Sequence, residues 1–204
     1  MATIAKDSGG GDYTPAPEGT HIARCVRVID LGTQKGSQQY PDAKHKVLIA
    51  WELCEERTEY EGVMTPILVS KRYTLSLHKK AGLRHDLESW RGRPFTAEEL
   101  DGFDLVKVLG HPCMITIVHA PSADGSRTYA NIKAVTSVPK SMAQACPQAH
   151  HDLYHYQIEE RAGGVFPKLS EKLRETIMQA AEWSDSAPGG YDDVPPHDDS
   201  DIPF

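Results

Sequence analysis

The sequence has few of the features that mark membrane or secreted proteins. It has four cysteines with no C-x-x-C pair among its 204 residues, and only 7% of the residues are aromatic. No apolar run approaches the roughly 20 residues that a transmembrane helix needs, and residues 1–12 contain no apolar stretch like that of a secretory signal. We therefore expect a cytoplasmic protein without a membrane span, in which these four cysteines are reduced thiols: Cys25, Cys54, Cys113 and Cys146.

Basic residues are missing from the last part of the chain. Residues 183–204 contain six aspartates and no lysine or arginine. Setting these six aspartates aside leaves 22 basic and 23 acidic residues in the rest of the chain. The formal net charge of -7 therefore belongs mostly to an acidic tail, and the body is nearly neutral. This charge balance does not exclude a nucleic-acid-binding surface on the body.

Apolar periodicity divides the rest of the chain into strands and helices. Between the third and fourth predicted strands, Leu83, Leu87 and Trp90 have the spacing of an amphipathic helix that ends at Gly92. A capping box at residues 96–99 predicts a short second helix. The order β-β-β-α-β-β predicts an all-β fold with added helices, a five-stranded barrel of the oligonucleotide/oligosaccharide-binding (OB) type. The predicted strands cover residues 18–31, 44–56, 66–78, 112–120 and 128–138.

Composition predicts five regions along the chain. Residues 166–183 form one helix in this prediction, because Leu169, Leu173, Ile177 and Ala181 make an apolar stripe. The regions are a flexible N-terminus at 1–17, an OB-fold domain at 18–139, a linker at 140–165, a C-terminal helix at 166–183 and a disordered acidic tail at 184–204.

The last seven residues, DDSDIPF, combine aspartates with a final Phe204. An exposed Phe contributes nothing to folding, but as a ligand it can fill an apolar pocket. Its α-carboxylate can then accept hydrogen bonds from an arginine while the aspartates lie on a basic ridge. This ending closely resembles the C-terminal tip of bacterial single-stranded DNA-binding proteins, which recruits replication, recombination and repair proteins. The resemblance implies such partners for Asp198, Asp199, Asp201, Ile202, Pro203 and Phe204.

The body resembles a second group of proteins. The stretch from SKRYTLSLHKK to HPCMITIVH, followed by YANIKAV and later by FPKLSEKL, is similar to phage-encoded OB-fold single-stranded DNA-binding proteins. The similarity covers about residues 14–139. It implies a protein that coats single-stranded DNA during phage replication and recombination in a bacterial host cell. The body does not resemble the core of the bacterial single-stranded DNA-binding proteins whose tip the tail resembles. Their tetramer is therefore not implied for this chain, and whether it forms a homo-oligomer stays open.

Single-strand binding needs cations that neutralise phosphates and exposed rings on which bases stack. In an OB fold, the ligand groove is lined by the second and third strands and by two loops. One loop joins strands one and two, and the other joins strands four and five. Core packing is the alternative for Trp51 and Tyr73, because each alternates with aliphatic residues along its strand. The candidates for DNA binding are Arg24, Arg27, Lys35, Tyr40, Lys46, Trp51, Lys71, Arg72, Tyr73, Arg127, Tyr129 and Lys133.

Catalysis has little support in the sequence. No phosphate-binding loop, hydrolase or metalloprotease motif occurs, so we expect neither enzymatic activity nor a cofactor. We interpret His150, His151 and His155 as linker residues, because no Cys or carboxylate completes a familiar zinc spacing. Three alternatives stay open: a recombination mediator or annealing protein on the same fold, an interaction protein that displays the tail without binding DNA, and a metal-dependent nuclease. We interpret five basic residues near the first helix as a solvated face: Lys79, Lys80, Arg84, Arg91 and Arg93.

Overall fold

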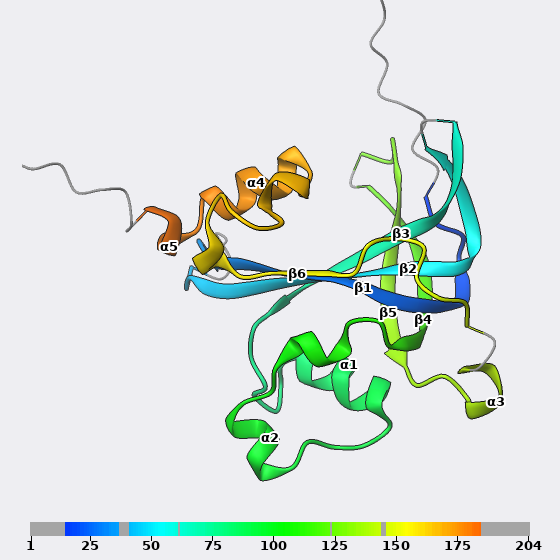
Figure 1. Cartoon of the computed structure of the whole chain (residues 1–204), viewed down its shortest axis with the longest axis horizontal. Coiled ribbons are helices and arrows are strands. Elements are labelled where there is room, and N and C mark those ends of the chain that lie inside the picture. The colour runs from blue at the N-terminus through cyan, green and yellow to red at the C-terminus, as the bar shows by residue number, and fades with distance from the viewer. Residues whose placement is uncertain (1–14, 37–40, 61, 123, 144–145, 185–204) are drawn as a thin grey trace, which may run out of the picture.

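Five antiparallel strands curl into a half-barrel, with a helix between the third and fourth strands (Figure 1). The computed structural model describes residues 15–36, 41–60, 62–122, 124–143 and 146–184. The mostly β architecture and the order β-β-β-α-β-β confirm the predicted fold class and are consistent with an OB fold. The barrel strands are β1 (Gly19–Gln34), β2 (Lys44–Tyr60), β3 (Val63–Thr74), β4 (Pro112–Pro121) and β5 (Thr128–Thr136).

The remaining elements cover the two sides of this sheet. In the part of the chain that the structure describes, no helix is long and apolar enough to cross a membrane. The helices and the sixth strand are α1 (Gly82–Arg91), α2 (Ala97–Asp101), the 3-10 helix η1 (Leu105–Val108), α3 (Lys140–Ala143), β6 (Tyr154–Tyr156), the 3-10 helices η2 (Ile158–Glu160) and η3 (Phe166–Lys168), α4 (Glu171–Met178) and α5 (Ala181–Ser184).

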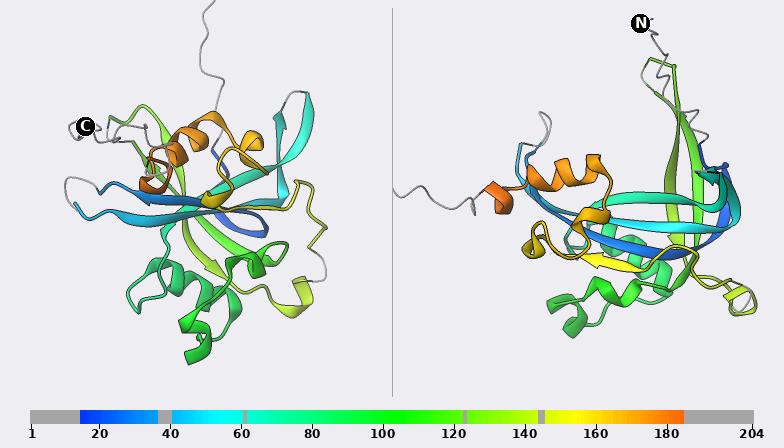
Figure 2. Two further views of the ribbon diagram at one scale, coloured as in Figure 1. Left: turned by 60° about the vertical axis from the view of Figure 1, so that its left-hand side comes forward. Right: turned by 45° about the horizontal axis from the view of Figure 1, so that its top comes forward.

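The strand order is β3-β2-β1-β4-β5, so β1 is the central strand and β3 and β5 are the outer edges. β1 pairs with β2 through its second part and with β4 through its first part. Two register shifts in the β1–β2 ladder, at Cys25/Arg27 and at Asp30/Gly32, add residues to β1. Such bulges bend and twist a strand, and Figure 2 shows β4 and β5 turning away from the direction of β1 to β3.

The first core fills the inside of the half-barrel. Val47, Ile49, Trp51 and Leu53 face it from β2, as their alternation predicts. On the other side, α1 contributes the three residues whose spacing predicts its apolar face, and the Trp90 ring centroid lies 6.0 Å from that of Trp51. The indole Nε1 of Trp90 donates to the carbonyl oxygen of Pro112 at 2.8 Å. This hydrogen bond ties α1 to the start of β4.

A second core lies on the opposite face of β1 and β2, beneath residues 154–184, which we call the C-terminal cover. Its β6 pairs in parallel with β1, so the predicted linker contains a strand. The predicted helix at 166–183 is instead divided into η3, α4 and α5. Figure 1 shows this cover and the α1–α2 region on opposite sides of the sheet. The second core contains Ile29, Leu31, Leu48, Ala50, Tyr156, Ile158, Phe166, Leu169, Ile177 and Ala180.

Close packing explains Gly32 in β1. Its φ of 67° is in the left-handed region, and a Cβ there would collide with Ile158 and Ala180 of the cover. A side chain at this position would therefore be strained and would also push the cover away from the sheet.

Polar contacts from β1 and β2 hold residues 146–151, which we call the linker latch. The Arg24 guanidinium donates to the carbonyl oxygens of Gly110, Cys146 and Pro147. The buried Glu52 carboxylate accepts hydrogen bonds from the backbone amides of residues 150 and 151 and, at 2.9 Å, pairs with the His151 ring. Burial raises the pKa of Glu52, but these hydrogen bonds outweigh it and leave the pKa below its ordinary value.

Candidate nucleic-acid interface

Four cavities follow one another along β3 and around its edge, from the face under the C-terminal cover to the start of α1, and we call them together the basic track. The first two have volumes of about 620 and 320 Å³ and share Arg27 and Leu68 in their walls. The third, of about 480 Å³, shares Arg72 with the second. The fourth, of about 280 Å³, shares Lys44 and Lys46 with the third. Because consecutive cavities share lining residues, a flexible extended ligand that bends around the β3 edge can contact all four.

The basic track is strongly cationic. Among the described residues that line it, two are carboxylates, Asp42 and Asp152. Asp152 lies 3.6 Å from the Lys168 ammonium, and both side chains are mostly exposed. The concentration of one charge along one groove therefore favours a polyanion as the ligand. The basic lining residues are Arg27, Lys35, Lys44, Lys46, Lys71, Arg72, Lys80, Lys168 and Lys172.

Arg27 lies between the sheet and the C-terminal cover, in the wall that the first two cavities share. Its guanidinium carbon lies 5.0 Å from the centroid of the Tyr154 ring, which holds the side chain in place by a cation–π contact. The Nε–H of Arg27 is buried and has no hydrogen-bond partner among the described residues. A buried donor without a partner costs about 1–3 kcal/mol. A ligand oxygen that reaches this Nε–H, after a small shift of the side chains around it, would accept the missing hydrogen bond and remove the cost of the unpaired donor.

Arg72 and Leu68 lie on the face of β3 that borders the groove. In the β2–β3 ladder, Arg72 is opposite Leu48, whose side chain is in the second core, so Arg72 points to the same side as the cover. Leu68 is partly exposed on this face, and Tyr60 is 65% exposed at the end of β2. Together with Tyr154, these residues provide apolar and aromatic surface beside the cations.

The structure places the rings of Trp51 and Tyr73 in the first core, which is the packing alternative that their alternation offers. Trp51 is 1% exposed and Tyr73 is 5% exposed. The Tyr73 hydroxyl donates to Asp86 at 2.8 Å, and burial raises its pKa above the ordinary range, so the hydroxyl stays protonated. The Lys71 ammonium lies 2.7 Å from the same Asp86 carboxylate. Lys71 therefore neutralises a buried acid, which leaves it less available for a phosphate.

The other candidates from the sequence lie in three different places. Arg24 belongs to the linker latch, where its guanidinium is used by three carbonyl oxygens. Arg127, Tyr129 and Lys133 are exposed on the β4–β5 turn and on β5, and they do not line the basic track. Lys35 and Lys46 line its last cavity, where the Lys46 ammonium donates to the Thr74 hydroxyl at 2.8 Å. Outside the described residues lie Tyr40, Asp198, Asp199, Asp201, Ile202, Pro203 and Phe204.

Sequence reasoning missed several residues of the groove. Lys44 begins the second strand next to the predicted Lys46, so its place at the strand start was a usable signal. Lys168 and Lys172 come from the C-terminal cover, and Tyr154 comes from β6. No local pattern indicates that the cover folds back beside β3, so these three residues become part of the groove only through tertiary contacts.

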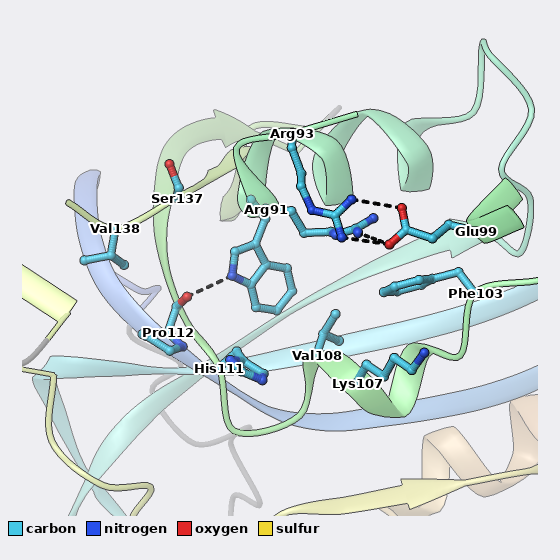
Figure 3. A pocket seen from close by; sticks show the side chains of 11 residues that line it. Arg91, Arg93, Glu99, Phe103, Lys107, Val108, His111, Pro112, Ser137 and Val138 are labelled. Carbon is cyan, nitrogen blue, oxygen red and sulfur yellow. Dashed lines mark hydrogen bonds and ion pairs between the residues drawn. The ribbon is translucent and has the colours of Figure 1, made fainter. Parts of the chain in front are cut away.

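A fifth cavity, of about 540 Å³, lies between α1, α2, η1 and the start of β4 (Figure 3). Arg91 and Arg93 both donate to the Glu99 carboxylate. The pKa of Glu99 is lowered to about 2, chiefly by the hydrogen bond from Arg93 and next by that from the Thr96 backbone amide. The Arg91 guanidinium also packs on Phe103, 4.9 Å from its ring centroid. The two arginines here are thus paired with a carboxylate, whereas among the described lysines and arginines that line the basic track only Lys71 and Lys168 have one.

Around the first helix, Lys79, Lys80 and Arg93 are exposed, as a solvated face requires, whereas Arg84 and Arg91 are half-buried. Arg91 and Arg93 join the ion pairs with Glu99, and Arg84 donates to Glu88 at 3.0 Å and to the Leu77 carbonyl oxygen. The expectation of a solvated face overlooked that the chain after α1 folds back and brings α2 beside it. Lys79 and Lys80 are exposed, and Lys80 lines the basic track.

Comparison with known proteins finds no protein-family model that matches the chain and no match among curated proteins. Within the residues that the structure describes, no three His, Cys, Asp or Glu side chains converge as they would around a metal ion. The basic track combines a row of cations with exposed apolar surface.

Proposed function

We propose that the protein binds single-stranded DNA without sequence preference through the basic track. The observation that carries the proposal is the succession of four cation-lined cavities, each sharing lining residues with the next, along the β3 edge of an OB-like half-barrel. Phosphates are the same in every sequence, so a groove that reads them with lysine and arginine binds all sequences alike. The action is binding alone, with no cofactor and no bond broken.

Single strands fit this groove better than duplexes for a chemical reason. Tyr60, Leu68 and Tyr154 offer surface that only an unpaired base can contact with its face, since duplex bases are stacked on one another. The cations on either side of these residues then hold the phosphates that flank such a base. The proposal therefore combines a charge term, which salt weakens, with a stacking term, which salt affects little.

For residues 184–204 we propose the recruitment of replication, recombination and repair proteins of a phage or its bacterial host. The support is the sequence DDSDIPF and its resemblance to the tip of bacterial single-stranded DNA-binding proteins. Phe204→Ala keeps every acidic charge, so it should lose the proteins that the wild type captures from host extract if the ring fills a pocket. Equal capture by both would reduce the tail to a solubilising segment.

Titration of labelled oligo-dT at several salt concentrations tests the DNA-binding proposal. If about four phosphates are neutralised, log K should fall with log salt at a slope near -3. A duplex of equal length should bind much more weakly under each condition. Equal affinity for the duplex, or affinity that does not change with salt, would contradict the proposal.

Two further assays test the alternatives. Release of shortened oligonucleotides in Mg²⁺ would indicate a nuclease, and faster pairing of complementary strands would indicate an annealing protein.

A further inference from the structure

Two thiols that no part of the proposed function uses lie side by side in the protein. The Sγ atoms of Cys54 and Cys146 are 3.1 Å apart, although 92 positions separate the two residues in the chain. This separation is about 1 Å longer than an S–S bond. Cys25 and Cys113 lie in the first core inside the half-barrel.

The surroundings hold the two sulfurs in this position independently of any bond between them. Cys54 follows Glu52 by two positions on β2, so both side chains point to the face that carries the linker latch. Cys146 belongs to that latch, and its carbonyl oxygen accepts a hydrogen bond from Arg24 at 3.1 Å. Glu52 holds the latch at the amides of residues 150 and 151. Anchors on both sides of the pair therefore keep the thiols in contact.

We propose that Cys54 and Cys146 are a site of reversible disulfide modification, in which a small-molecule disulfide such as oxidised glutathione converts the linker latch from a polar contact to a covalent one. The proposal does not depend on DNA binding. In the first step, the Cys146 thiolate attacks one glutathione sulfur, the glutathione S–S bond breaks, and one glutathione thiolate leaves. In the second step, the Cys54 thiolate attacks the Cys146 sulfur and releases the second glutathione. Two protein thiols lose two protons and two electrons, and one glutathione disulfide becomes two glutathione thiols.

The order of the two steps follows from where the thiols are placed. Cys54 lies within the β2 strand, and burial raises the pKa of its thiol to about 12, so its thiolate is scarce. Cys146 lies between α3 and β6, outside both elements, so local opening of the latch exposes it without breaking the sheet. Reaction therefore begins at Cys146 and is slow, because it waits for this opening.

The disulfide would link β2 to the segment that leads into the C-terminal cover. A cross-link between residues so distant in sequence restricts the unfolded chain strongly, which raises the stability of the folded state. It would also prevent the latch from leaving β2, so the start of the cover stays beside the basic track. We expect the midpoint of thermal unfolding, Tm, to rise by at least about 5 °C on oxidation.

The test is incubation of the full chain with oxidised glutathione, followed by acid quenching, alkylation and tryptic mass mapping. The expected product is one cross-linked pair of peptides, residues 47–57 with residues 141–161. Its formation should be accompanied by the loss of two equivalents of free thiol per chain. Dithiothreitol should restore both thiols and the original Tm. Cys146→Ser, which keeps the size of the side chain, is the matched variant: it should neither form the cross-link nor gain stability from the oxidant.

Each other outcome overturns the proposal. Four alkylated cysteines after prolonged oxidation would show that the pair does not react. A bond to Cys25 or Cys113, or a bond between two chains, would show that oxidation follows unfolding. A correct cross-link without a rise in Tm would show that the bond does not fasten the latch. If Cys146→Ser has a lower Tm than the wild type in reductant, Cys54→Ser replaces it as the control.

Discussion

Arg72 is the residue that most directly connects the fold to the proposed binding. It is exposed, it lines two consecutive cavities, and its place in the β2–β3 ladder directs it to the groove. Arg72→Ala should weaken binding to oligo-dT equally for all sequences and reduce the salt slope by about 1, because one phosphate contact is lost. Fluorescence titration at four salt concentrations measures both quantities.

Arg93→Ala is the matched control for this measurement. It removes the same charge from an exposed arginine that lines the cavity beside α1 and α2, which shares no lining residue with the basic track. Its affinity and salt slope should stay close to those of the wild type. If both variants lose affinity equally, net charge rather than the basic track determines binding.

Tyr73 is a core residue, and its hydroxyl should matter for stability alone. Tyr73→Phe removes the donor to Asp86 and should lower the free energy of unfolding by about 1–2 kcal/mol. Its affinity for oligo-dT should not change, because the variant keeps the ring, which is only 5% exposed where Tyr73 borders the third cavity. Urea denaturation and titration of the same preparation test the two expectations together.

Tyr129→Phe provides the comparison at an exposed position. Tyr129 is half exposed on β5, so loss of its hydroxyl should change stability by no more than about 0.5 kcal/mol. Lost affinity with unchanged stability in Tyr73→Phe would contradict its placement in the core.

At the scale of elements, one buried carboxylate attaches the linker latch to β2. The hydrogen bonds to Glu52 lower its pKa in the folded protein below the ordinary value of 4.5. The stability that they provide is therefore complete above the unfolded pKa and is lost as the pH falls through the folded pKa. Glu52→Gln should destabilise the protein by about 1–3 kcal/mol at pH 7, and by less at pH values below about 4.

Urea denaturation at pH 7, 5, 4 and 3 measures this difference. Glu55→Gln, at an exposed position on the same strand, controls for the loss of one negative charge and should have little effect at any of these values. A gap between the wild type and Glu52→Gln that widens on acidification would contradict the assigned role of this carboxylate.

At the scale of the whole molecule, the charges of the tail and of the groove have opposite signs. Residues 195–204 contain three of the six C-terminal aspartates, and nine basic side chains line the track. Deletion of these ten residues should raise the affinity for oligo-dT at low salt, because an intramolecular anionic competitor is lost. The gain should disappear at high salt, where the charges are screened.

A triple variant with Asp198→Asn, Asp199→Asn and Asp201→Asn is the control, since it removes charge and keeps the length. It should reproduce the gain. A deletion that weakens binding would mean that the tail contributes to the DNA site rather than competing with it.

The sequence by itself determined the elements of the half-barrel. Period-two alternation in β2 and the helical spacing of Leu83, Leu87 and Trp90 are local patterns, and each follows from burying one face of an element. The capping box at Thr96 and Glu99 is also local, and both of its hydrogen bonds are present. The same patterns identified Arg27 and Arg72 as basic residues on the first and third strands.

Only the tertiary structure decided which of these residues share a groove. Trp51 and Tyr73 are on strands that the sequence predicts, but whether a ring is core or contact surface depends on which face α1 covers. Lys168 and Lys172 reach the basic track because the cover buries apolar residues of β1 and β2 from the second side. The contact between Cys54 and Cys146 depends on that same return of the chain. Burial between distant segments has no local period, so the sequence carries no pattern from which it can be read.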